Sequence, residues 1–94
     1  MASKKIIIIG AGIAGLSAGC YLQMNGYETQ IIEAHNAPGG LCTSWKRKGY
    51  TIEGAIHGLL GSSSANPFYN LWNELIEMDA IEFVNYPVQA VFEF

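Results

Sequence analysis

Four consecutive isoleucines lead directly into three closely spaced glycines near the start of this chain. The β-branched run over residues 5–9 shows no polar alternation, which predicts a strand buried on both faces, as in a parallel sheet. Gly10, Gly12 and Gly15 follow the run in a G-x-G-x-x-G pattern. Apolar and small residues then continue over residues 13–25, where we predict a helix. The segment therefore predicts a strand, a tight turn and a helix in succession.

The same segment also resembles an export signal. Two lysines precede an uncharged run over residues 6–22, and Ser17-Ala18-Gly19-Cys20 resembles a lipoprotein cleavage site. The leucine that such a site needs three places before its cysteine lies four places before it, at Leu16. Glycines weaken an inserted helix, and the uncharged run barely reaches the ~20 residues of a membrane span. An exported lipoprotein is kept as an alternative, which mass analysis of the N-terminus would test.

A second strand predicted over residues 28–33 completes a right-handed βαβ unit. Each glycine then has a physical role, since Gly10 permits the turn, Gly12 lets the backbone approach a pyrophosphate, and Gly15 lets helix and strand pack closely. Glu33 lies 18 residues after Gly15, close to the spacing of about 20 expected of a carboxylate that binds a ribose. A carboxylate there also disfavours a 2′-phosphate. This pattern predicts a dinucleotide-binding site.

The remaining chain predicts a few short elements. Residues 34–44 hold proline and glycines and predict a loop, and residues 45–53 predict a short hairpin. Asn66 and Pro67 predict the cap and the first position of a second helix, with an apolar face that continues to Met78.

The tail over residues 81–94 predicts two strands interrupted at Pro87. No linker divides residues 1–94. The predicted fold class is α/β: a Rossmann-type βαβ unit with an incomplete sheet, a short β-hairpin and a second helix.

Composition narrows the function classes. The chain has 94 residues, of which 50% are hydrophobic and 14% charged, so we expect a folded protein with a small core. The net charge is -3 and the basic residues cluster only at Lys46-Arg47-Lys48, which argues against a nucleic-acid partner. Cys20 and Cys42 have neither disulfide-framework nor zinc-site spacing, so no metal site is predicted. Both are expected to be small buried residues in a reducing compartment, the cytoplasm.

Two longer stretches carry a family resemblance. "IIIIGAGIAGLSAGCYLQMNGYETQIIEAHNAPGG" resembles the extended dinucleotide-binding motif of FAD-dependent oxidoreductases, in which the acid is followed about six residues later by a paired glycine, here Gly39-Gly40. "GGLCTSWKRKGYTIEGAIHGLLGSS" is similar to the phytoene desaturase and carotenoid isomerase branch, close to the amine-oxidase superfamily. The motifs span residues 5–61. Many relatives carry arginine where this chain has Leu41, which puts an amine-oxidase-type contact in doubt.

The resemblance implies FAD as the cofactor and assigns site residues. Backbone N–H groups would hold the pyrophosphate at Gly10, Gly12, Ile13, Ala14 and Gly15. Glu33 would bind the adenosine ribose. The loop at Gly39, Gly40 and Leu41 would pass against the cofactor, Ser44 would lie near the phosphate or ribityl chain, and His57 would line the flavin or pack rather than act as a base. Catalytic residues are not assigned, and a hydrophobic polyene-type substrate is expected by resemblance.

Length sets a further expectation. A dinucleotide crevice draws on two mononucleotide-type halves, and only one βαβ unit is predicted here. We expect the N-terminal part of an FAD/NAD(P)-binding Rossmann-like domain, without a separate substrate domain, that alone binds FAD weakly and catalyses nothing. Its expected partners are a missing C-terminal segment or its own copies, through an exposed sheet edge, and a membrane surface in a longer form. A non-redox binding module resembling Rab GDP-dissociation inhibitors is a second alternative.

Overall fold

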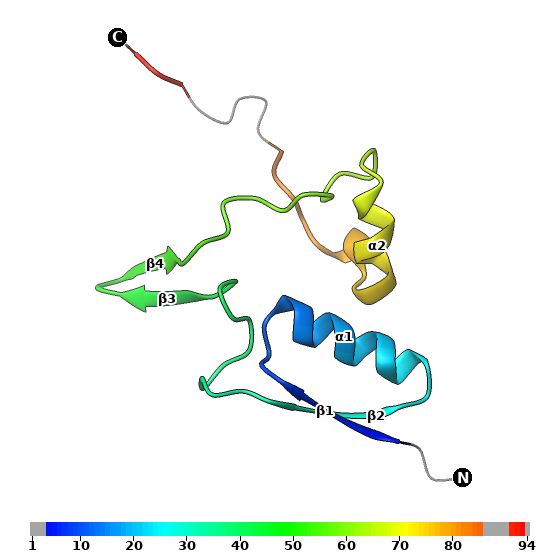
Figure 1. Ribbon diagram of the computed structural model, residues 1–94. Helices are drawn as coiled ribbons and strands as arrows, with labels where there is room; N and C mark the ends of the chain where they lie inside the picture. The colour runs from blue at the N-terminus through cyan, green and yellow to red at the C-terminus, as the bar shows by residue number, and fades with distance from the viewer. Residues whose placement is uncertain (1–3, 86–90, 94) are drawn as a thin grey trace. The chain divides into compact units, whose positions relative to one another are not determined.

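A computed structural model describes residues 4–85 and 91–93 of the chain (Figure 1). The chain divides into two compact units, Met1–Leu59 and Leu60–Phe94. The first contains a βαβ unit and a hairpin, and the second contains a helix and a turn of 3-10 helix.

The predicted βαβ unit is confirmed. Strand β1 (Lys5–Ile9) is followed by helix α1 (Ile13–Met24) and strand β2 (Glu28–Ile32), and the two strands pair in parallel (Figure 1). The helix ends at Asn25 because Gly26 follows it with a φ of 86°, a conformation that glycine adopts without a steric penalty. A short link of this kind returns the chain to the sheet beside its first strand.

Helix α1 covers one face of the β1–β2 sheet. Side chains alternate along each strand, and those of Ile8 and Ile31 point at the helix. A Cβ placed on Gly19 would lie 3.5 Å from Ile8 Cδ1 and 3.4 Å from Ile31 Cδ1, so the absence of a side chain there permits close helix–sheet packing. On the opposite face, Ile7 is 57% exposed and Ile9 is 79% exposed.

The expectation that the first strand is buried on both faces is therefore wrong. A parallel strand is buried on both sides when helices cover both faces of its sheet. Among the described residues, only α1 packs on the β1–β2 sheet. On α1, the apolar side chains of Ile13 and Met24 are also exposed. Cys20 and Cys42 are exposed as well, which corrects the expectation that both are buried.

The predicted hairpin is confirmed. Strand β3 (Ser44–Arg47) pairs antiparallel with β4 (Tyr50–Glu53). Lys48 and Gly49 connect them with φ values of 50° and 80°. Two consecutive positive φ angles make a type I′ turn, whose twist matches that of the two strands.

In the second unit, helix α2 (Phe68–Leu75) begins one residue later than the predicted first position, Pro67, which is its N-cap. Asn66 Oδ1 accepts the N–H of Phe68 at 2.9 Å, which satisfies one of the free amides at the start of the helix. The helix ends at Leu75, earlier than the predicted apolar face, because Ile76 is extended. Met78 is 1% exposed and opens the 3-10 helix η1 (Met78–Ala80).

The predicted pair of strands in the tail is not formed over residues 81–85 and 91–93, and residues 86–90, with Pro87, lie outside the described residues. Two isolated strands have little stability in water without a surface to pack on. Within the described chain, none of the helices has the length and apolar character needed to cross a bilayer. Residues 6–22, which resemble an export signal, fold as strand, turn and helix.

Candidate functional site

The two glycine motifs meet in space. The N–H of Gly39 donates to the carbonyl of Ala11 at 2.7 Å, and Gly12 and Gly39 form an isolated parallel bridge. A Cβ on Gly40 would lie only 3.0 Å from the Cα of Gly12. The turn after β1 and the loop after β2 thus come together as bare backbone, with no side chain between them.

Gly10 and Gly15 fix the shape of the turn. Gly10 has a φ of 100°, and its N–H donates to the carbonyl of Ile32 at 2.8 Å, which extends the pairing of the two strands by one residue. A Cβ on Gly15 would overlap the carbonyl oxygen of Gly10 and lie 3.3 Å from Ile8 Cγ2. Helix α1 can therefore start directly on the end of β1 only if residue 15 has no side chain.

The start of α1 offers free backbone donors. Its first intrahelical bond runs from the N–H of Leu16 to the carbonyl of Gly12, at 2.9 Å, so the preceding amides have no acceptor within the helix. Among the described residues, no side chain caps this end and no acidic residue lies in the first turn. These amides and the partial positive charge of the helix end are available to an anion.

Glu33 is bound to the same turn. Its Oε2 accepts the N–H of Ala11 at 2.6 Å, and its Oε1 accepts the N–H of His35 at 3.1 Å. The Ala11 amide is the main cause that lowers the pKa of Glu33, because backbone hydrogen bonds stabilise the charged carboxylate. The acid is thus ionised and held beside the glycine turn at neutral pH.

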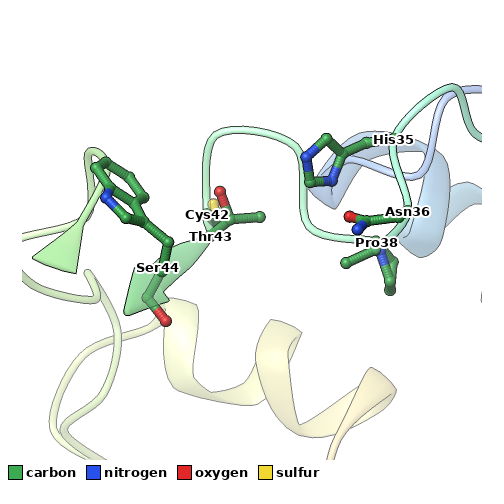
Figure 2. A pocket seen from close by; sticks show the side chains of 8 residues that line it. His35, Asn36, Pro38, Cys42, Thr43 and Ser44 are labelled. Carbon is green, nitrogen blue, oxygen red and sulfur yellow. The ribbon is translucent and has the colours of Figure 1, made fainter. Parts of the chain in front are cut away.

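A pocket of about 640 Å³ lies in the loop that follows Glu33 (Figure 2). In Figure 2, His35, Asn36 and Pro38 face Cys42, Thr43 and Ser44 across this space. Its lining consists of His35, Asn36, Ala37, Pro38, Cys42, Thr43, Ser44 and Trp45. The pocket adjoins the glycine site through His35, whose amide is bonded to Glu33.

The structure unites most, but not all, of the residues that the sequence assigns to the site. The first glycine motif, Glu33 and the paired glycines lie around one turn, and Ser44 lines the neighbouring pocket. Leu41 is 82% exposed, and His57 is exposed in the irregular segment after β4.

Sequence reasoning missed Ala11. This residue is 4% exposed, and its amide and carbonyl connect the turn to Glu33 and to Gly39 respectively. A small residue between two motif glycines is the signal that could have identified it.

Comparison with known proteins places this geometry in context. Residues 8–75 match the NAD(P)-binding Rossmann-like domain family. Coproporphyrinogen III oxidase of Staphylococcus aureus is 41% identical over 61 residues, which are 63% of this chain and 13% of the relative. The chloroplastic/chromoplastic 15-cis-phytoene desaturase of Glycine max is 40% identical over 73 residues, which are 76% of this chain and 12% of the relative.

A solved structure, the CLA-producing fatty acid isomerase from P. acnes, superposes with a TM-score of 0.60 at 35% identity. That match covers 85% of this chain and 18% of the isomerase. The chain spans only 13% and 12% of the lengths of the two curated relatives.

Proposed function

Since this chain belongs to the NAD(P)-binding Rossmann-like domain family, we propose that it supplies the dinucleotide site of a flavin-dependent oxidoreductase and that the dinucleotide is FAD. One observation carries the proposal. The turn after β1 and the paired glycines after β2 meet without side chains, next to amides that have no acceptor in the helix. A pyrophosphate needs both a close approach to backbone and free N–H donors.

The amides of Gly12, Ile13, Ala14 and Gly15 are the proposed pyrophosphate donors. Gly10 acts differently, because its N–H already donates to Ile32, and it contributes the sharp turn instead. The tight contact between Gly40 and Gly12 supports a role for the second motif in keeping this surface free of side chains.

Glu33 is the proposed ribose ligand. A carboxylate has about four acceptor positions, and the amides of Ala11 and His35 use two of them. The backbone of Ala34 also stabilises the charged carboxylate, and the remaining acceptor capacity is proposed to serve the ribose hydroxyl groups. Because the lowered pKa keeps Glu33 charged, a 2′-phosphate would be repelled, which favours FAD or NAD over NADP.

The choice of FAD is supported by the paired glycine at residues 39–40 and by the phytoene desaturase relative. When bound, the isoalloxazine ring supplies a hydride acceptor. Leu41, Ser44 and His57 are the proposed neighbours of the cofactor beyond the pyrophosphate. For a longer protein that contains this portion, we propose a hydrophobic polyene as the substrate.

A Gly12→Ala variant tests the site without disturbing the fold. A Cβ at residue 12 has its nearest neighbour at 3.9 Å, and the φ of -75° suits alanine, so the variant should fold normally. Its methyl group would occupy the surface offered to the pyrophosphate. Losing a hydrogen bond to a charged group costs about 1.5–3 kcal/mol, so FAD affinity should fall about tenfold or more in a fluorescence titration.

Ser17→Ala, later in α1, is the matched control and should bind FAD as the unchanged chain does. Circular dichroism would verify that both variants fold. Equal FAD affinities of the unchanged chain and a folded Gly12→Ala variant would contradict the proposal, and so would preferential binding of NADP.

A further inference from the structure

The β3–β4 hairpin has one apolar, aromatic face. The antiparallel register pairs Trp45 with Ile52 and Arg47 with Tyr50. Because alternate residues of a strand point to the same side, these four side chains lie on one face. Trp45 is 48% exposed and Tyr50 is 74% exposed, so this face is open to its surroundings.

The hairpin packs on no other described helix or strand, although Trp45 also lines the pocket beside the loop that follows Glu33. An isolated two-stranded hairpin is marginally stable in water, and one with Trp, Ile and Tyr on one face gains stability when that face is covered.

The tip of the hairpin concentrates positive charge. Lys46, Arg47 and Lys48 are three of the five basic residues in a chain of net charge -3. All three are exposed, and none forms an ion pair with another described residue. Arg47 lies on the aromatic face and Lys48 lies at the turn, whereas Lys46, which pairs with Thr51, lies on the opposite face. Arg47 and Lys48 are therefore free to meet an external anion beside the aromatic face.

The backbone at Lys48 is a second, independent observation. Its φ of 50° is the one positive φ among the described non-glycine residues. Asparagine or glycine is preferred at this position of a type I′ turn, because the Cβ atom of most residues is disfavoured at a positive φ. A lysine at a position that disfavours it indicates that its charge has a use.

We propose that the β3–β4 hairpin docks on an anionic lipid surface. Trp and Tyr favour the boundary between water and lipid, Ile52 adds apolar area, and Arg47 and Lys48 would meet lipid phosphates. A nucleic acid fits less well, because the chain as a whole is acidic and Ile52 offers no ring for stacking on bases. This inference goes beyond the nucleotide site and uses none of its proposed cofactor ligands.

Vesicles of phosphatidylcholine with and without phosphatidylglycerol test the proposal. The chain has two tryptophans, so Trp72→Phe, in the other unit of the chain, leaves Trp45 as a single reporter. Binding should require phosphatidylglycerol, weaken as salt is raised, and shift the Trp45 emission to shorter wavelength. Each lysine near a charged bilayer is worth about 1 kcal/mol, so Lys48→Asn should weaken partitioning about fivefold.

Lys48→Asn is informative because asparagine suits the turn, so loss of the hairpin cannot explain weaker binding. Lys4→Asn is the matched control, since it removes the same charge outside the hairpin and should leave partitioning nearly unchanged. Three results would each overturn the proposal: no binding to vesicles with phosphatidylglycerol, equal losses in the two variants, or tighter binding to a single-stranded oligonucleotide than to these vesicles.

Discussion

The backbone N–H of Ala11 donates a 2.6 Å hydrogen bond to Oε2 of Glu33. The acid at the end of β2 is thus connected to the turn after β1, and it holds that turn whether or not a ribose is present. One carboxylate therefore stabilises the site and takes part in the proposed recognition. These two roles can be separated by experiment, because only the first depends on the protein alone.

Glu33 should make the stability of the chain depend on pH. Backbone amides, first that of Ala11, hold its pKa below the ordinary value of 4.5. The charged form therefore contributes stability that is present above the unfolded-state pKa and is lost as pH falls through the lower folded-state pKa. In thermal unfolding, the midpoint of Glu33→Gln should fall less on acidification below pH 4.5 than that of the unchanged chain.

Glu53→Gln is the control for this measurement, since Glu53 lies in β4 and takes no part in the hydrogen bond to Ala11. It should retain the acid dependence of the unchanged chain. Identical acid profiles for the unchanged chain and Glu33→Gln would show that the bond to Ala11 adds no stability.

Gly15 and Gly19 lie in the same helix but should respond oppositely to alanine. At Gly15 a Cβ would overlap the backbone carbonyl of Gly10, so Gly15→Ala should destabilise by about 1–3 kcal/mol. At Gly19 the nearest atoms are ends of isoleucine side chains at 3.4 and 3.5 Å, and helix propensity favours alanine by about 1 kcal/mol. Gly19→Ala should be neutral or stabilising. Urea unfolding followed by circular dichroism compares them, and equal effects would contradict this account.

Asn66 should stabilise the start of α2. Its Oδ1 accepts the N–H of Phe68, so Asn66→Ala should reduce local stability by about 0.5–2 kcal/mol, as for other helix caps. Hydrogen exchange of the amides in α2 would measure the change. Asn70→Ala, at an exposed position within the helix, is the control. The amides of α2 should exchange at the same rate in this variant as in the unchanged chain.

The uncovered face of the β1–β2 sheet should promote association between copies of the chain. Ile9 is 79% exposed at the end of β1, where it lies opposite Ile32 of β2. Ile9→Thr keeps a β-branched side chain and removes apolar area, so light scattering should report smaller particles at equal concentration. Leu41→Thr, at a loop residue that is 82% exposed, should have a smaller effect. A monodisperse monomer before substitution would contradict the prediction.

Local signals predicted the βαβ unit well. The isoleucine run, the motif glycines and Gly26 each act on the residues next to them, so strand, turn and helix could be located from the chain itself. The hairpin followed from the glycine at residue 49, although the positive φ of Lys48 could not be inferred from a lysine.

Properties that depend on packing were harder to predict. Burial of β1 on both faces and of Cys20 depends on whether other elements cover them, which sequence periodicity cannot report. Helix α2 stops before Met78 because a side chain competes with the helix. Asn73 Oδ1 accepts the N–H of Met78 at 3.1 Å, and this bond holds the chain after the helix has ended. Ala11 was missed because its role requires two distant partners.

The hydrogen bond between Gly39 and Ala11 closes a loop of chain that contains most of the βαβ unit. The site lies where this loop is closed, and the link between α1 and β2 lies at its far end. The chain between these two residues leaves the site along α1 and returns along β2, and the hydrogen bond joins its two ends. The link at Asn25 and Gly26 is the part of this segment that is farthest along the chain from both Ala11 and Gly39. Insertions or a new chain break at this link would therefore be tolerated more readily than any change in the length of the segment between Glu33 and Gly39.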